Sequence, residues 1–481
     1  MVRFEPMRTA LARALALAVV AATALRVLAR GYLPGDDALR HAAKAVAGRP
    51  WSEILLLRPG FDLDSNPGWH AILGAVHGLL GLGAVDLVLV SVALLFVVIS
   101  IGPILVLRRP EAWLVALVLA NVLEPLNMSR LLSGRPFLVS SAVVPLALLL
   151  WHRLEEERPW RVLVLFAVCG VASSWVHGSY YLLALPVAGV LLTGRVRAAV
   201  RLAGAFAVGV LAGAVLTGHP LGHLVQMVRH GYVSAGAANA TDALVSEFQP
   251  FEGRAVGALV FLLLLAWRRR RAPDAPPPWR DPVAVTTALC WALGYVAARF
   301  WVDWGLFALM TLAAQEAEAA LESLSSADER PARVALALSG GLVFLGMGSD
   351  VQQRWSPVSG RLFLSRQNPS HAPWLPGPGG IAYSTEMSVF FAMFLVNPDA
   401  PWKYAVGFEP ALMPAEDYAV YRDVKTSHGD FAAYGPWLRK MRPEDRLYVQ
   451  YRSNQPPPIT TLEWFQPTYT IWAGRLPRPA P

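Results

Sequence analysis

The chain has 481 residues, of which 55% are hydrophobic and only 16% are charged, and its formal net charge at pH 7 is +8. Soluble proteins carry about 25% charged residues, so this composition excludes an ordinary soluble globular protein. The basic excess does not indicate nucleic-acid binding, because the arginines gather at the ends of apolar blocks, as at Arg108-Arg109 and from Arg268 to Arg271, which is the distribution that sets membrane topology.

The apolar blocks predict an all-α polytopic membrane protein, because a helix needs roughly 20 apolar residues to cross a bilayer and closes its backbone hydrogen bonds within itself. The first block contains Arg13 and Arg26, and we interpret it as a retained span and not as a cleaved signal peptide. Residues 71–82 are moderately apolar and predict either an interfacial helix or the start of the second span. We expect about eleven spans, near residues 9–28, 84–107, 112–126, 136–151, 162–176, 180–192, 198–216, 255–267, 283–298, 304–320 and 334–347.

Charge also predicts the orientation of the chain. The loops that follow the even-numbered spans are the more basic ones, so the N-terminus is expected in the cytoplasm. We therefore predict a transmembrane domain of catalytic type at residues 1–349, with outer loops at 31–70 and 218–254, and a C-terminal extracytoplasmic α/β domain at 350–481. Cys169 and Cys290 lie inside apolar blocks, which argues against a structural disulfide.

Carboxylates gather in the first outer loop. Asp36 and Asp37 are adjacent, and two neighbouring carboxylates repel each other, which makes a shifted pKa and a role in proton or metal chemistry plausible. The alternative is a helix N-cap before residues 38–48. Asp62 and Asp64, with His70 shortly after, form a second group that suits an acceptor or a divalent metal, or simply a turn before the next helix.

Three later features carry polar groups to the same outer side. Arg130 and Arg135 oppose the positive-inside rule, and arginine binds phosphate through a two-pronged fork, although a lipid headgroup contact would also explain them. His177 lies among aromatic residues, where an ordinary interfacial aromatic belt is the alternative. Arg299 stands beside an apolar span, either as a functional group or as the partner of Asp303 at an i,i+4 spacing.

The order of these motifs resembles the glycosyltransferase C superfamily, in particular the bacterial relatives of protein O-mannosyltransferases and aminoarabinose transferases. The resemblance covers about residues 1–350, with Asp37 where the family has Glu, a wider arginine spacing, and Gly178-Ser179 inserted before Tyr180. The matching segments are Asp36-Asp37, Asn66-Pro67-Gly68, Ser129 to Pro136, Ser174 to Tyr180, and Arg299-Phe300.

The resemblance implies a polyprenyl-phosphate sugar as donor and a glycan, lipid or protein as acceptor, at the outer face of the bacterial cytoplasmic membrane. Asp36 or Asp37 would act as general base, and Arg130, Arg135 and Arg299 would offset the charge of the leaving phosphate. No cofactor is required.

In the transferase interpretation, the outer loop that carries Arg229 is expected to cover the site. A metal-dependent variant would use Asp36, Asp37, Asp62 or Asp64. The alternatives to a transferase are a catalytically inactive scaffold of the same fold in envelope assembly, and a transporter of lipid or solute.

Overall fold

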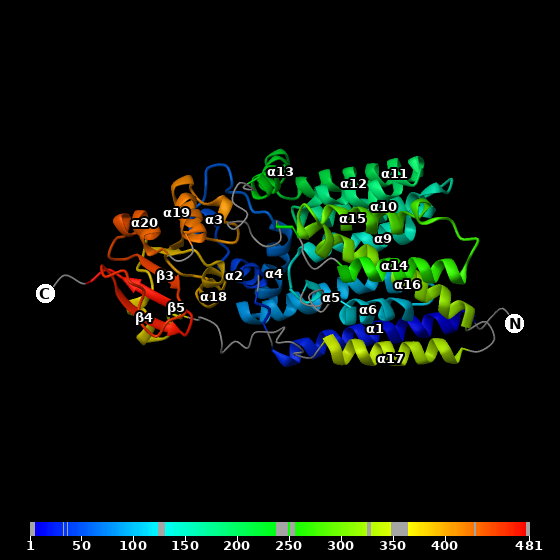
Figure 1. The fold of residues 1–481 in the computed structure, drawn as a ribbon, viewed down its shortest axis with the longest axis horizontal. Coiled ribbons are helices and arrows are strands. Elements are labelled where there is room, and N and C mark those ends of the chain that lie inside the picture. Colours follow the sequence, from blue (N-terminus) through cyan, green and yellow to red (C-terminus); the bar gives the residue numbers. More distant parts are fainter. Residues whose placement is uncertain are drawn as a thin grey trace.

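The computed structural model describes residues 5–31, 33–35, 37–123, 130–236, 249–250, 255–324, 329–347, 364–427 and 430–477. Most of these residues are helical, and the five strands β1 to β5 fall between residues 381 and 475. The helices form an elongated bundle. The N-terminus lies at one end of the molecule, and the small sheet lies at the other end with the C-terminus beyond it (Figure 1).

Four helical segments of the described chain are long and apolar enough to cross a membrane. They are Thr9–Arg30 within α1 (Glu5–Arg30), α5 (Ala84–Val106), Phe137–Glu155, which joins α8 (Phe137–Ser141), α9 (Val143–Leu150) and the turn η1 (Trp151–Glu155), and α12 (Val196–Val215). Apolar side chains face outward on these helices; Leu25 is 64% and Val208 is 63% exposed. Such a continuous apolar exterior suits lipid and not water.

The remaining apolar blocks are helical as well, so a helix occupies each block from which a span was predicted. Most of these helices are shorter than the four long ones. They are α6 (Glu111–Leu123), α10 (Trp160–Trp175), α11 (Ala184–Leu192) with the preceding turn η2 (Tyr180–Leu183), α14 (Ala255–Arg271), α15 (Pro282–Leu293), α16 (Leu306–Leu324) and α17 (Arg330–Met347).

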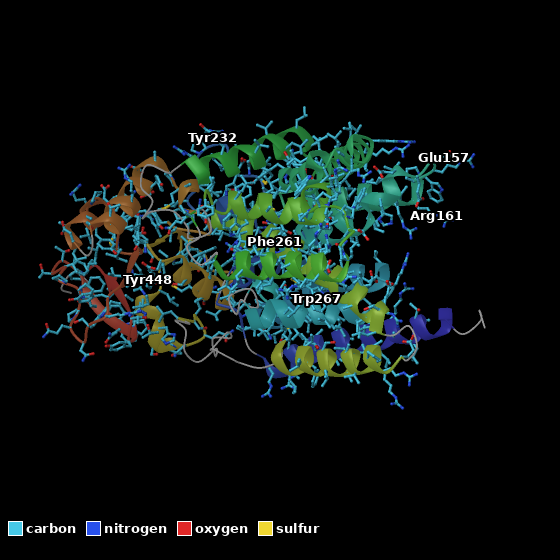
Figure 2. All side chains as sticks on the ribbon, turned by 45° about the vertical axis from the view of Figure 1, so that its right-hand side comes forward. Glu157, Arg161, Tyr232, Phe261, Trp267 and Tyr448 are labelled. Atoms are coloured by element: carbon cyan, nitrogen blue, oxygen red, sulfur yellow. The ribbon has the colours of Figure 1, made fainter. Side chains whose placement is uncertain are left out.

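Charged connections between these helices meet at one end of the bundle. Arg109 binds Glu329 at 2.8 Å, Arg268 pairs with both Asp281 and Glu316, and Arg195 lies 3.7 Å from Glu155. Figure 2 shows Glu157 and Arg161 at the end farthest from Tyr448 of the sheet. The basic loops and the sheet therefore occupy opposite ends of the molecule.

Helices α10 and α12 pack through glycines. A Cβ atom added at Gly209 would lie 1.9 Å from the backbone oxygen of Ala167, and one added at Gly170 would lie 2.7 Å from the backbone oxygen of Phe206. Small residues that allow such close backbone approach are typical of helix pairs within membranes, where dispersion contacts replace the hydrophobic effect as the driving force.

Within the outer loop predicted at residues 218–254, Pro220–Gly236 form the helix α13. Its mixed polarity is that of an amphipathic helix. Leu221, Val225, Val228 and Tyr232 are all more than half exposed along one side, whereas Gln226 is buried and exchanges two hydrogen bonds with the backbone of Leu63. Tyr232 points away from the bundle in Figure 2. The polar face of α13 thus covers the protein, and its apolar stripe faces outward.

The first outer loop is also partly helical. It contains α2 (Ala38–Ala47), α3 (Trp51–Ile54) and the start of α4 (Pro67–Leu80). The helix α4 is separate from α5, since Gly81 adopts a left-handed conformation with φ of 66° and ends it. This agrees with an extra helix at residues 71–82 ahead of the second span.

The C-terminal region contains a mixed sheet with the strand order β2-β1-β3-β5-β4. Strand β1 is parallel to β2 and β3, while β5 is antiparallel to both β3 and β4. The predicted α/β character of this region is therefore confirmed. The strands are β1 (Ile381–Ser384), β2 (Lys403–Tyr404), β3 (Arg446–Gln450), β4 (Glu463–Thr468) and β5 (Ile471–Arg475), and the main helices are α18 (Met387–Val396), α19 (Ala415–Thr426) and α20 (Gly435–Lys440).

One hydrophobic cluster joins the C-terminal region to the helical bundle. Helix α18 is apolar on all sides, and Phe390 and Phe394 pack in a cluster that also contains Leu39 of α2 and Leu87 of α5. Leu55 even forms a parallel bridge with Tyr404 at the edge of the sheet. The C-terminal region is thus fixed to the first outer loop and to the start of α5.

We predict that Gly209→Ala destabilises the protein by about 1–3 kcal/mol, because the added methyl group overpacks a backbone contact that cannot yield. Thermal unfolding in detergent measures the effect. Gly204→Ala on the same helix is the matched control, since a Cβ atom there meets nothing within 4 Å. Equal melting temperatures for the two variants would contradict the close-packing argument.

Candidate functional site

A cavity of about 880 Å³, measured with its open mouth, lies where the helical bundle meets the C-terminal region. Its walls come from segments far apart in sequence. Asp37, Arg40 and His41 come from the start of α2, Arg135 precedes α8, and His177 follows α10. Further lining residues include His230 of α13, Arg299, and Phe391, Phe408 and Glu409 of the C-terminal region. Four predicted site residues, Asp37, Arg135, His177 and Arg299, therefore line one cavity.

Asp37 stands immediately before α2, but its side chain does not cap that helix. The carboxylate instead forms a two-pronged pair with Arg40, in which Nη2 donates to Oδ2 at 2.9 Å, and Arg135 Nε lies 3.5 Å from the same oxygen. Burial alone would raise the pKa of Asp37, but Arg40 and Arg135 hold it well below its usual value. Asp37 is therefore an ionised carboxylate, and not the weakly acidic group that adjacent carboxylates suggested.

Two histidines continue inward from Asp37. His41 Nε2 lies 3.5 Å from Asp37 Oδ2, His41 Nδ1 lies 2.9 Å from His70 Nε2, and His70 Nδ1 lies 2.6 Å from Asp64 Oδ2. Both rings are buried, at 1% and 7% exposure. Burial, with Arg40 nearby, lowers the pKa of His41 to about 3, so this ring is neutral at physiological pH.

The loop before α4 positions the far end of this chain of groups. Asp64 Oδ1 accepts a hydrogen bond from the backbone N–H of Asn66 at 3.0 Å, which closes a turn that leads directly into Pro67 at the start of α4. The same oxygen also accepts a hydrogen bond from Trp51 Nε1–H at 3.3 Å. The turn expected at Asp62 to His70 is thus present, and it also orients a buried ionisable pair.

His177 lies near two of the cavity arginines, Arg135 and Arg299. Burial, followed by the charges of Arg299 and Arg135, holds the pKa of His177 well below its usual value, so its ring is neutral. Its Nδ1 lies 3.5 Å from the hydroxyl of Ser140, and its ring meets Phe137 edge-on. A neutral imidazole beside two guanidinium groups favours an anionic ligand.

Arg130 meets a different partner. Its Nη2 and Nε donate to Asp303 Oδ1 at 2.5 and 2.8 Å, and Arg299 Nε lies 3.5 Å from the other oxygen of the same carboxylate. Asp303 is fully buried within a π-helical turn, Phe300–Gly305. Such turns are frequent at functional sites. Arg299 therefore both pairs with Asp303, as its spacing predicted, and lines the cavity, whereas Arg130 is held behind it.

The other predicted residues lie outside the lining of the cavity. Arg229 stacks over Phe61, 4.8 Å from the ring centre, while its neighbour His230 faces the cavity. Asp62 is exposed, and Asp64 and His70 lie behind His41 and Asn66, which line the cavity. Asp36 lies outside the described residues. Within the described chain, no group of three or more His, Cys, Asp or Glu side chains is placed to hold a metal ion.

Several lining residues were not predicted from the sequence. Arg40 and His41 share a face of α2 with Asp37 at the spacing i,i+3 and i,i+4, which was a usable signal once α2 was known to be a helix. Glu409 carried no signal, because only the docking of the C-terminal region brings it within 3.7 Å of His230.

Comparisons with known proteins assign the chain to no family. No protein-family model matches the chain, and no curated protein matches it either. Inferences about function therefore rest on the cavity and on the sequence.

We predict that Asp303→Asn destabilises the protein by about 3–5 kcal/mol, because removal of one partner leaves buried guanidinium charge without its carboxylate. The melting temperature in detergent is the measurement. Asp274→Asn removes an exposed carboxylate of the loop after α14 and is the control. A melting temperature as high as that of the control would mean that Arg130 and Arg299 do not depend on Asp303.

Proposed function

We propose that this chain is a membrane glycosyltransferase of the glycosyltransferase C type, which moves a sugar from a polyprenyl-phosphate donor to an acceptor. One observation carries the proposal. Asp37, Arg135, His177 and Arg299, which span most of the helical region in sequence, line a single cavity. A base beside cationic groups is the arrangement that transfer from a phosphate donor requires.

The proposal includes a topology. Eleven helices cross the bacterial cytoplasmic membrane, the basic loops face the cytoplasm together with the N-terminus, and the cavity and C-terminal region face outward. The separation of the basic loops from the sheet supports this orientation. So does the outward apolar stripe of α13, because an amphipathic helix of this kind lies in a membrane interface.

The residues divide the chemistry between them. Asp37 accepts the proton of the acceptor hydroxyl while that oxygen forms a bond to the anomeric carbon. The bond from this carbon to the donor phosphate oxygen breaks, and the lipid phosphate leaves with the electron pair. Arg135 and Arg299 offset the charge that grows on the phosphate, as preorganised cationic donors do. Phe391 and Phe408 offer apolar surface for a sugar face.

The tight pairing of Asp37 favours one alternative. A carboxylate held by Arg40 and Arg135 is a weak base, and the same geometry would serve a catalytically inactive scaffold in envelope assembly. In that case the cavity binds a lipid-linked anion without turning it over.

We expect purified protein to release lipid phosphate from a polyprenyl-phosphate sugar in the presence of acceptor, and we expect Asp37→Asn to reduce kcat by about 10²–10⁴-fold. Release of lipid phosphate is measured with and without chelator, and Asp86→Asn, an exposed carboxylate at the start of α5, is the control.

The outcomes separate the alternatives. Donor binding without release, unchanged in Asp37→Asn, would favour the scaffold. Loss of lipid-phosphate release in the presence of chelator would favour the metal-dependent mechanism.

A further inference from the structure

We infer that His41, His70 and Asp64 form a proton relay behind Asp37, in which the unprotonated Nε2 of His41 takes the proton that Asp37 receives. The inference rests on the proposed function for the origin of that proton. The hydrogen-bond geometry assigns the direction of the relay independently of any substrate.

The direction of the relay follows from Asp64, the last group of the chain. Asp64 Oδ1 accepts hydrogen bonds from Trp51 and from the Asn66 backbone, so this carboxylate acts only as an acceptor. Burial would raise the pKa of Asp64, but His70, Lys44 and the Asn66 amide together lower it, which keeps the group ionised. The 2.6 Å contact therefore requires His70 Nδ1 to carry the proton and to donate it.

The tautomers of both rings then follow in turn. Burial lowers the pKa of His70, so its ring is neutral at physiological pH. A neutral ring that donates through Nδ1 has a lone pair on Nε2, so at 2.9 Å this atom accepts from His41 Nδ1–H. His41 then has its own lone pair on Nε2, the atom that faces Asp37 Oδ2 at 3.5 Å. This contact is the longest of the three.

Such a chain offsets the weakness of Asp37 as a base. A carboxyl group whose pKa is held low by two arginines gives its proton up readily, and the lone pair of His41 is aimed at it. When His41 Nε2 accepts this proton, His41 Nδ1–H can pass to His70 Nε2. The positive charge then lies on His70, beside the Asp64 carboxylate and farther along the chain from the Arg40 pair. Asp37 is left ionised while the product and the lipid phosphate leave, and the proton then returns from His70 through His41 and Asp37 to solvent in the open cavity, which restores the chain for another turnover.

In this relay Asp37 touches the acceptor, whereas His41, His70 and Asp64 act through it. Asp64 is a positioning residue: it fixes the tautomer of two rings and stabilises the cation that forms. The charged and titratable groups that face the chain are Arg40 and Lys44 of α2, Arg135 before α8, His177 after α10, and His223 of α13.

Nitrogen-15 NMR of ring-labelled histidine tests the assignment without any substrate. We expect both rings to carry their proton on Nδ1 in the wild-type protein, with the signals assigned through His41→Asn and His70→Asn. Asp64→Asn can turn its amide N–H toward His70, which would reverse the chain and place protons on Nε2 of both rings. Asp62→Asn, an exposed carboxylate of the same loop, should leave the tautomers unchanged.

Kinetics test the relay itself. We expect Asp64→Asn to lower kcat by about 10²-fold with little change in KM, and Asp64→Glu to restore part of the loss. The acid limb of the pH dependence of kcat should move to lower pH in Asp64→Asn, because removal of the carboxylate lowers the pKa of the histidine pair. A purely structural role would lower kcat without moving this limb.

The outcomes keep the two proposals apart. Protons on Nε2 in the wild-type spectrum, or full turnover in Asp64→Asn, would overturn the relay and leave the transferase standing. Nδ1 protonation in a wild-type protein that turns over no donor would contradict the transferase and retain the assigned direction. If Asp64→Asn fails to fold, the wild-type spectrum alone decides the tautomers.

Discussion

The buried Asp37 carboxylate, shared by Arg40 and Arg135, is the interaction on which the candidate site depends. It joins the start of α2 to the segment before α8, and both arginines also lie in the cavity wall. Charges buried at this depth persist only when they are paired and hydrogen-bonded. A second cluster, in which Asp303 holds Arg130 and Arg299, fixes another arginine of the wall. The two carboxylates thus fix the three arginines that line the cavity in the described part of the chain.

The cavity also depends on the docking of the C-terminal region. Phe391 and Glu409 complete its wall, and they are placed by the core that α18 shares with α2 and α5. Helix α13 covers a further side through Gln226 and through His223, whose Nε2 contacts the carbonyl of Ser174 at 3.1 Å. The site is therefore composite, and its geometry is set by packing between elements distant in sequence.

This explains which features the sequence could predict. Helices followed from the length of the apolar blocks. Asp37 was singled out by the adjacent carboxylate of Asp36, Arg135 by its conflict with the positive-inside rule, His177 by its place among aromatic residues, and Arg299 by its position beside an apolar span. The helix α13 within the predicted outer loop was not foreseen, because its apolar residues recur with helical spacing among polar ones and form no continuous block. The link from His41 through His70 to Asp64 could not be predicted, because it depends on α2 packing beside α4. Arg130 and Arg135 looked equivalent in sequence, yet only Arg135 lines the cavity.

The shared core has a consequence for how the chain is made. Leu39 and Leu55 leave the ribosome early, whereas their partners Phe390, Phe394 and Tyr404 are synthesised only after the whole helical bundle. Contacts of such sequence separation form late, because loop closure must precede them. During synthesis the first loop therefore holds an uncovered apolar face, and the cavity acquires its final wall only at the end. A nascent chain arrested before residue 390 would contain most of the ionisable groups of the site, yet its pocket would lack one side.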